Sequence, residues 1–233
     1  GTGVTVSGGS KLTVGGTVTN KGTLNAPLEI TGALTNSGTV NSSLTLNDTY
    51  TLTNNGTVNA PVEFNGVTTL AGSGTTTFSS ATINSGKTLK TSGHNITISG
   101  DCTNNGTLTA GAGSITMTGN LANNGTFTGA GGNISITGDL TNASTFKTGA
   151  GALSLIGNLA NNGTFTANTG AITMTGNLTN SGTFNGAGGT ISITGDLTNA
   201  STSTFKTAAG ALSLSGNLTN SGTFTIGGAG AVT

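Results

Sequence analysis

The stretch ITMTGNLTNSGTF, residues 172 to 184, recurs with small changes through more than half of the chain. A near copy, ITMTGNLANNGTF, occupies residues 115 to 127. A fixed period of about 20 residues is too short for two packed helices, and it suits one turn of a solenoid built from strands. The copies lie 19 residues apart five times and then 21, counted at their central glycines: Gly100, Gly119, Gly138, Gly157, Gly176, Gly195 and Gly216.

Apolar residues alternate with polar ones inside each copy, which is the period of a β-strand. In one copy they stand at Ile172, Met174, Leu178 and Phe184, and the other copies are apolar at the same positions. Three short strands per turn should point these side chains inward, so that three walls enclose one core. The sequence therefore predicts an all-β fold, a β-solenoid with about 19 residues per coil and about twelve coils.

One inward column consists mostly of phenylalanine. Because like residues stack at the strand spacing of about 4.8 Å, the rings should form an offset ladder along the axis. The two extra residues of the last spacing lie in 201–204, beside a turn, where a bulge can absorb them without a change of face. After Leu108, the predicted ladder contains Phe127, Phe146, Phe165, Phe184, Phe205 and Phe224.

A column of asparagines follows the second strand of each copy and is usually followed by x-Gly-Thr. Stacked side-chain amides can hydrogen-bond from coil to coil, while glycine permits the positive φ that a sharp corner demands. Asn-Gly is also a hairpin signal, but a hairpin every 19 residues would leave two apolar columns without partners. We interpret the motif as a solenoid corner, with a ladder of Asn104, Asn123, Asn142, Asn161, Asn180, Asn199 and Asn220.

The first part of the chain carries the same signature less regularly. TNKGTL ends at Leu24, TNSGTV at Val40 and TNNGTV at Val58. A degenerate copy follows at 72–78, and INSGKTL near Gly86 resembles an irregular turn. These segments predict further coils of the same solenoid.

The chain should therefore be one domain without a linker. Residues 1–93 would form irregular coils of 16 to 18 residues, and residues 94–233 the regular coils of 19. At the strand spacing, about twelve coils give a rod about 55 to 60 Å long.

Composition excludes several classes of protein. The 233 residues include 42 glycines, 2 prolines and no tryptophan, with six basic residues balancing six acidic ones. Disorder is disfavoured because threonine, valine and isoleucine are abundant and net charge is zero. Nucleic-acid binding lacks a basic cluster, and a membrane span lacks a run of about 18 apolar residues. The single cysteine, Cys102, stands in a column of leucines, which predicts a buried apolar filler.

Candidate catalytic and metal-binding residues are few. Asp101, Asp139 and Asp196 occupy a corner position that other coils fill with asparagine, at least two coils apart, so they look like solvated residues rather than a catalytic pair. His94 is the only histidine and has no second ligand nearby for a metal. We expect no enzyme activity, no cofactor and no metal.

The outward residues between the isoleucine positions form a wall rich in serine and threonine. Regular T-x-T walls are typical of ice-binding β-solenoids, and such a wall could equally lie along a glycan. Against this, threonine is simply a good exposed strand residue. The candidate binding wall is represented by Thr116, Thr118, Thr173 and Thr175.

The 19-residue period, the corner G-[ND]-L-[TA]-N-x-G-T-[FL] and the glycine-rich closing turn make residues 94–233 similar to the haemagglutinin-type repeats of filamentous-haemagglutinin-like adhesins. The resemblance of residues 1–93 is weaker. It implies a right-handed parallel β-helix that forms the shaft of a secreted bacterial surface protein, with recognition at the tip. The chain lacks the Asn-Pro-Asn-type secretion domain of that family, because its only prolines are Pro27 and Pro61.

These observations predict a non-enzymatic structural protein, extracellular or on the cell surface. It would be the shaft of an adhesin or the subunit of a filament, because repeats without a covering segment at either end suit stacking onto more of the same. Its partners would be further copies of itself, stacked end to end, or the rest of a longer adhesin. The alternative is a surface-binding module whose Ser/Thr wall binds glycan or ice. Neither nucleic acid nor a membrane span is expected.

Overall fold

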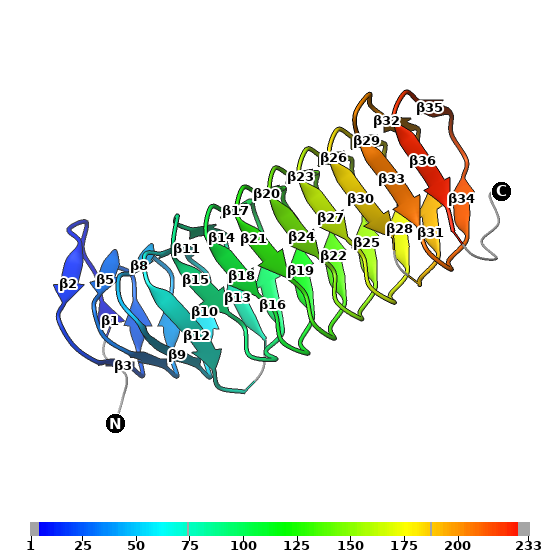
Figure 1. Ribbon diagram of the computed structural model, residues 1–233. Helices are drawn as coiled ribbons and strands as arrows, with labels where there is room; N and C mark the ends of the chain where they lie inside the picture. Colours follow the sequence, from blue (N-terminus) through cyan, green and yellow to red (C-terminus); the bar gives the residue numbers. More distant parts are fainter. Residues whose placement is uncertain (1–4, 74, 187, 228–233) are drawn as a thin grey trace.

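The computed structural model describes residues 5–73, 75–186 and 188–227, which form an elongated rod of stacked coils (Figure 1). These residues contain 36 strands and no helix. Successive strands follow one another from wall to wall, and each pairs in parallel with the strand one coil away. The predicted all-β solenoid with three walls is confirmed.

The first wall consists of sheet A near the beginning of the chain and sheet D after it. A hydrogen bond of 3.0 Å from the Ser79 N–H to the Ala60 carbonyl joins the two stretches. Sheet A contains β1 (Thr5–Val6), β4 (Thr23–Leu24), β7 (Thr39–Val40) and β10 (Thr57–Val58). Sheet D contains β13 (Thr76–Phe78), β16 (Ile96–Ile98), β19 (Ile115–Met117), β22 (Ile134–Ile136), β25 (Leu153–Leu155), β28 (Ile172–Met174), β31 (Ile191–Ile193) and β34 (Leu212–Leu214).

The second wall is sheet B. Its twelve described strands are β2 (Leu12–Val14), β5 (Leu28–Ile30), β8 (Leu44–Leu46), β11 (Pro61–Phe64), β14 (Ser80–Ile83), β17 (Cys102–Asn104), β20 (Leu121–Asn123), β23 (Leu140–Asn142), β26 (Leu159–Asn161), β29 (Leu178–Asn180), β32 (Leu197–Asn199) and β35 (Leu218–Asn220).

The third wall is sheet C. Its twelve described strands are β3 (Val18–Asn20), β6 (Leu34–Asn36), β9 (Tyr50–Asn54), β12 (Val67–Ala71), β15 (Thr88–Lys90), β18 (Thr107–Thr109), β21 (Thr126–Thr128), β24 (Thr145–Lys147), β27 (Thr164–Thr166), β30 (Thr183–Gly186), β33 (Thr204–Thr207) and β36 (Thr223–Ile226). From the first strand to the last, eleven steps at the strand spacing give a length of about 53 Å.

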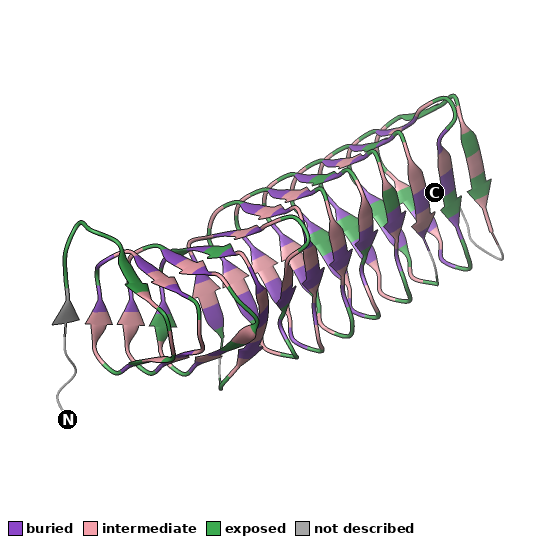
Figure 2. Ribbon diagram, turned by 60° about the vertical axis from the view of Figure 1, so that its left-hand side comes forward, coloured by how far each residue is buried: buried purple, intermediate pink, exposed green. Residues whose placement is uncertain are grey.

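A single core runs along the inside of the three walls. Figure 2 shows buried and more exposed residues alternating along the strands, as the sequence pattern requires. The columns keep their register over the two extra residues, because Phe184 pairs with Phe205 and Leu178 with Leu197. The extra residues form a turn in which Thr202 has a φ of 68°.

The LTN-x-GT motif occupies two different corners of the solenoid. In the regular coils, Asn104 ends β17 of sheet B and the chain turns into sheet C. In the first coils, Asn20 and Asn36 end strands of sheet C, and the chain turns into sheet A. The two sets of motifs therefore do not form equivalent corners. The motif encodes a corner but does not specify which one.

The degenerate copy between the two regions differs from its interpretation as a further copy of the motif. Phe78, in the degenerate copy, lies in β13 and pairs with Ile98 of sheet D, outside the phenylalanine column. INSGKTL forms an irregular turn, as predicted, within a coil that has strands in sheets B and C. Its corner is longer because four residues, 84–87, stand where the next coil has two, 105–106.

The corner glycines serve a purpose other than the predicted positive φ. Positive φ among the described glycines occurs at Gly86 (72°), in the longer corner of INSGKTL, and at positions in other turns such as Gly93 (90°), but not at the Asn-x-Gly corner of the regular coils, so the prediction is wrong there. A Cβ on Gly125 would lie 2.0 Å from the Gly106 carbonyl oxygen, and one on Gly182 would lie 2.1 Å from that of Gly163. Glycine is needed because the backbones of successive corners approach too closely for a side chain.

Candidate functional site

The predicted asparagine ladder lies at the corner between sheets B and C. Each amide nitrogen donates to the side-chain oxygen of the next asparagine at 2.7–2.8 Å, from Asn104 through to Asn220. The same nitrogens donate to carbonyls of the next coil, as Asn161 does to Thr183 at 2.9 Å. Asn104 to Asn199 are fully buried. These amides are occupied in holding coils together and leave no free row for a ligand.

The predicted phenylalanine ladder lies in sheet C. Its rings, from Phe127 to Phe224, are stacked at centroid distances of 4.4–5.1 Å and interplanar angles of 2–13°. Phe127 to Phe205 are completely buried. Because the rings stack face over face with their neighbours, they contribute dispersion contacts in addition to buried area.

The three aspartates lie at the corner between sheets D and B. Asp101 accepts a hydrogen bond from the backbone N–H of Asn120 at 2.9 Å, and Asp139 accepts one from Asn158 at 2.8 Å. Asp196 accepts from Asn217 in the same way at 2.7 Å. Asparagines of the column do the same for their neighbours, as Asn120 does for Asp139. The column therefore requires a side-chain Oδ1 acceptor, which asparagine and aspartate both supply, rather than a negative charge.

The remaining candidate residues for chemistry are separated from one another. Burial raises the pKa of the Cys102 thiol to about 12, because the thiolate would be desolvated. His94 lies in the turn from sheet C to sheet D, after Gly93. The described residues contain no group of three or more His, Cys, Asp or Glu side chains that could hold a metal.

The candidate Ser/Thr wall is the outer face of sheet D. Thr116 and Thr173 are the central residues of β19 and β28, and Thr118 and Thr175 follow these strands. Two strands lie between them, so the two pairs stand about 14 Å apart on the same face. The hydroxyl of Thr118 donates to the Ser99 carbonyl at 2.7 Å. Threonine and serine alternate irregularly in the paired outward column, which contains Thr97, Thr116, Ser135, Ser154, Thr173, Ser192 and Ser213.

A more regular hydroxyl wall, which was not predicted from the sequence, lies on the outer face of sheet C. The residue before each ladder position is threonine in eight successive strands. The signal was the recurring triplet T-[FL]-[TKN], since residues that flank an inward side chain on a strand must point outward. The column contains Thr88, Thr107, Thr126, Thr145, Thr164, Thr183, Thr204 and Thr223.

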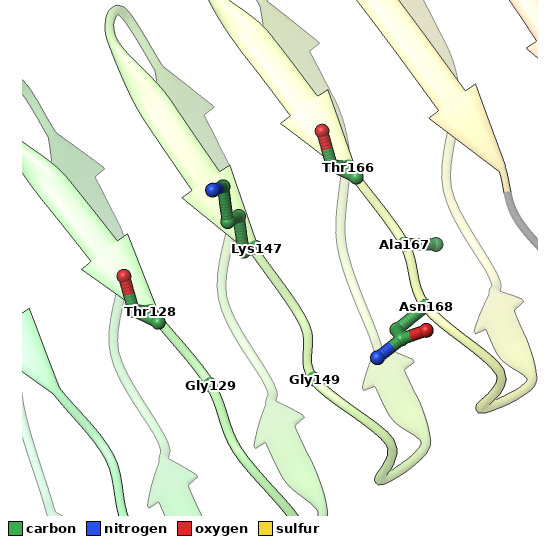
Figure 3. A pocket seen from close by; sticks show the side chains of 7 residues that line it. All are labelled: Thr128, Gly129, Lys147, Gly149, Thr166, Ala167 and Asn168. Carbon is green, nitrogen blue, oxygen red and sulfur yellow. The ribbon is translucent and has the colours of Figure 1, made fainter.

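A hollow of about 370 Å³ lies where this wall meets the turn into sheet D (Figure 3). Thr128, Lys147 and Thr166 line it from three adjacent strands, and Asn168 lines it from the turn. Gly129 and Gly149 contribute no side chains, which leaves the space open. The hollow combines one ammonium group with two hydroxyls and an amide.

Ion pairing among the described residues is limited to Lys11 and Glu29, near the beginning of the rod. The hydrogen bond from Lys11, with a second from Asn47, lowers the pKa of the Glu29 carboxyl. The lysines of the regular coils are therefore unpaired within the part of the chain that the structure covers.

No protein-family model, curated protein or solved structure matches the chain. The assignment of a β-solenoid architecture therefore depends on the pairing of the strands in the structure. Nothing in the described part of the structure is a helix long and apolar enough to cross a membrane.

Proposed function

We propose that the protein is a non-enzymatic structural shaft, extracellular or on the cell surface, of the kind that adhesins of the filamentous-haemagglutinin type use to extend a recognition tip. Sheets B and C, each with twelve described strands, support a role in reach and stiffness. The proposal depends on one observation, the hydrogen bonding of the polar side chains. The buried amides and the corner aspartates, which would be the first candidates for binding or catalysis, bond to the neighbouring coil.

Electron microscopy of the purified chain over a concentration series tests this proposal. Short rods at every concentration would identify a shaft segment of something longer, and unbranched filaments that lengthen with concentration would identify a stacking subunit. Limited proteolysis of the same samples should leave the rod intact, because its backbone is hydrogen-bonded along three walls. Globular particles, or hydrolysis of a polysaccharide by the pure protein, would contradict the proposal.

The alternative is a surface-binding module that uses the outer face of sheet D. It is supported by the in-register pairing of Thr116 with Ser135 and of Thr173 with Ser192 on that face. Replacement of Thr116, Thr118, Thr173 and Thr175 by tyrosine should then abolish binding to ice or to an arrayed glycan, with the fold unchanged. Replacement of Thr141 and Thr179, which are exposed on sheet B, is the control. Equal binding by all variants would reject this alternative.

A further inference from the structure

The outer face of sheet C carries a regular row of positive charge beside its threonine column. Lys90, Lys147 and Lys206 share the second outward column of this face. They stand on β15, β24 and β33, so each is three strands from the next, or about 14 Å at the strand spacing. The residues between them are threonine or asparagine: Thr109, Thr128, Thr166 and Asn185.

Negative charge in the regular coils is segregated from this face. Asp101, Asp139 and Asp196 stand at the corner between sheets D and B, the one corner that sheet C does not border. Neither outward column of sheet C from β15 to β36 contains an acidic residue. A chain of zero net charge therefore presents a positive face over eight successive strands, and that face attracts anions.

The hollow beside Lys147 is a second and independent feature of the same face. In Figure 3 the side chains of Thr128, Lys147 and Thr166 stand on three neighbouring strands, and Asn168 lies in the turn below them. Its volume of about 370 Å³ lies in the range of a small-ligand site. An ammonium group next to hydroxyl and amide groups suits a carboxylate attached to a hydroxyl-rich ring.

We propose that the outer face of sheet C, from β15 to β36, binds an extended carboxylated polysaccharide that runs along the axis of the rod. The three lysines pair with carboxylates of the polymer, and the threonine column hydrogen-bonds to its hydroxyls. The hollow at Lys147 receives one sugar unit. A single strand of nucleic acid fits less well, because the outward columns carry no aromatic side chain on which a base can stack.

Each exposed ammonium–carboxylate contact is weak, so the affinity depends on several contacts along one polymer. The rod supplies them at a fixed spacing. Salt should weaken the binding strongly, since all three lysines are exposed and within reach of screening ions.

Binding of the purified chain to immobilised polygalacturonate at low ionic strength tests the proposal. The row variant carries Lys147→Gln and Lys206→Gln. Its control carries Lys11→Gln and Lys21→Gln, which remove the same charge away from the row. We expect the wild type and the control to bind, and the row variant to lose affinity by about tenfold or more. An equal loss in both variants, or no binding by the wild type, would overturn the proposal.

A steric pair distinguishes the two hydroxyl walls. Thr164→Trp places a bulky side chain on the outer face of sheet C next to the hollow, and Thr173→Trp does the same on sheet D; both threonines are exposed. Only Thr164→Trp should abolish binding to polygalacturonate, with the circular dichroism spectrum and melting temperature of both variants unchanged. Loss with Thr173→Trp alone, or equal binding to neutral dextran, would also overturn the proposal. The shaft function stands or falls separately, on particle shape.

Discussion

The first coils and the regular coils use the same corner motif to build two different cross-sections. In the first coils the asparagine ladder, Asn20 to Asn36 to Asn54, lies between sheets C and A. In the regular coils it lies between sheets B and C, where the first coils place apolar residues such as Phe64 and Ile83. The comparison teaches that the motif specifies the geometry of a corner, while the apolar columns around it decide where the corner falls.

The core of sheet C changes with the corner. Leu34, Leu52 and Leu70 form one inward column in the first coils. The phenylalanine column of the regular coils instead continues the line of Tyr50 and Thr68. The largest side chains therefore move by two residues along the strand, and the two packings meet within β9 to β17.

Among the described residues, three of the four buried side-chain polar atoms without a hydrogen-bond partner lie at this junction, and the fourth is the Thr207 hydroxyl in β33. The Tyr50 and Thr68 hydroxyls and the Asn104 side-chain oxygen are buried, and none has a hydrogen-bond partner in the structure. Asn104 begins the second ladder, next to Ile83, which supplies no donor. Since a buried polar group without a partner destabilises by about 1–3 kcal/mol, the junction should be the weakest point of the rod.

The largest loss of stability is expected from a substitution in the core on one side of the junction. Phe165→Ala removes a completely buried ring with stacked neighbours on both sides, and should lower the free energy of unfolding by about 3–5 kcal/mol. Leu52→Ala is its counterpart in the first coils and should lower it by about 2–5 kcal/mol. Denaturant titration followed by circular dichroism measures both. Because coils can unfold locally, the coils on the substituted side of the junction should unfold first in each variant. A shift near zero for Phe165→Ala would mean that the rings do not support the core.

The next largest loss of stability is expected when one asparagine is removed from an asparagine ladder. Asn161→Ala removes the donor to the Asn180 side-chain oxygen and to the Thr183 carbonyl, and should destabilise by about 2–4 kcal/mol. Asn36→Ala removes the matching donor to Asn54 at the other corner. If the motif is the same structural unit at both corners, the two melting temperatures should fall by similar amounts. A large fall for one variant alone would show that the two ladders are not equivalent.

The alternation of apolar residues allowed the walls, the coil period and both ladders of the regular region to be predicted, because strand period is a local property. The change of corner could not be predicted, since TN-x-GT reads the same whether a strand of sheet C or of sheet B precedes it. The wall of Phe78 depended on pairing with Ile98, a contact between coils. The outer threonine row was available in the triplets around the phenylalanines, whereas the hollow at Lys147 depends on glycines in a turn that no periodicity describes.

A smaller effect tests the close approach of the corners. Gly182→Ala would place a Cβ 2.1 Å from the Gly163 carbonyl oxygen, so the backbone must shift, and we expect a loss of about 1–3 kcal/mol. Gly16→Ala is the control, because a Cβ there meets nothing within 4 Å. Thermal melts of the two variants should differ clearly. If Gly182→Ala melts with the wild type, corner spacing is not what requires glycine.

The smallest change in the free energy of unfolding is expected from substitutions at the junction itself. Thr68, in β12, and Thr91, directly after β15, are both fully buried, but the Thr68 hydroxyl has no partner, while that of Thr91 accepts the Gly111 N–H at 3.1 Å. Thr68→Val removes an unpaired group and should raise the free energy of unfolding by about 1 kcal/mol. Thr91→Val leaves an N–H without its acceptor and should lower it by about the same amount. Opposite shifts in the denaturation midpoint would show that mismatched packings, and not buried threonine as such, weaken the rod between β9 and β17. Shifts of the same sign would remove that explanation.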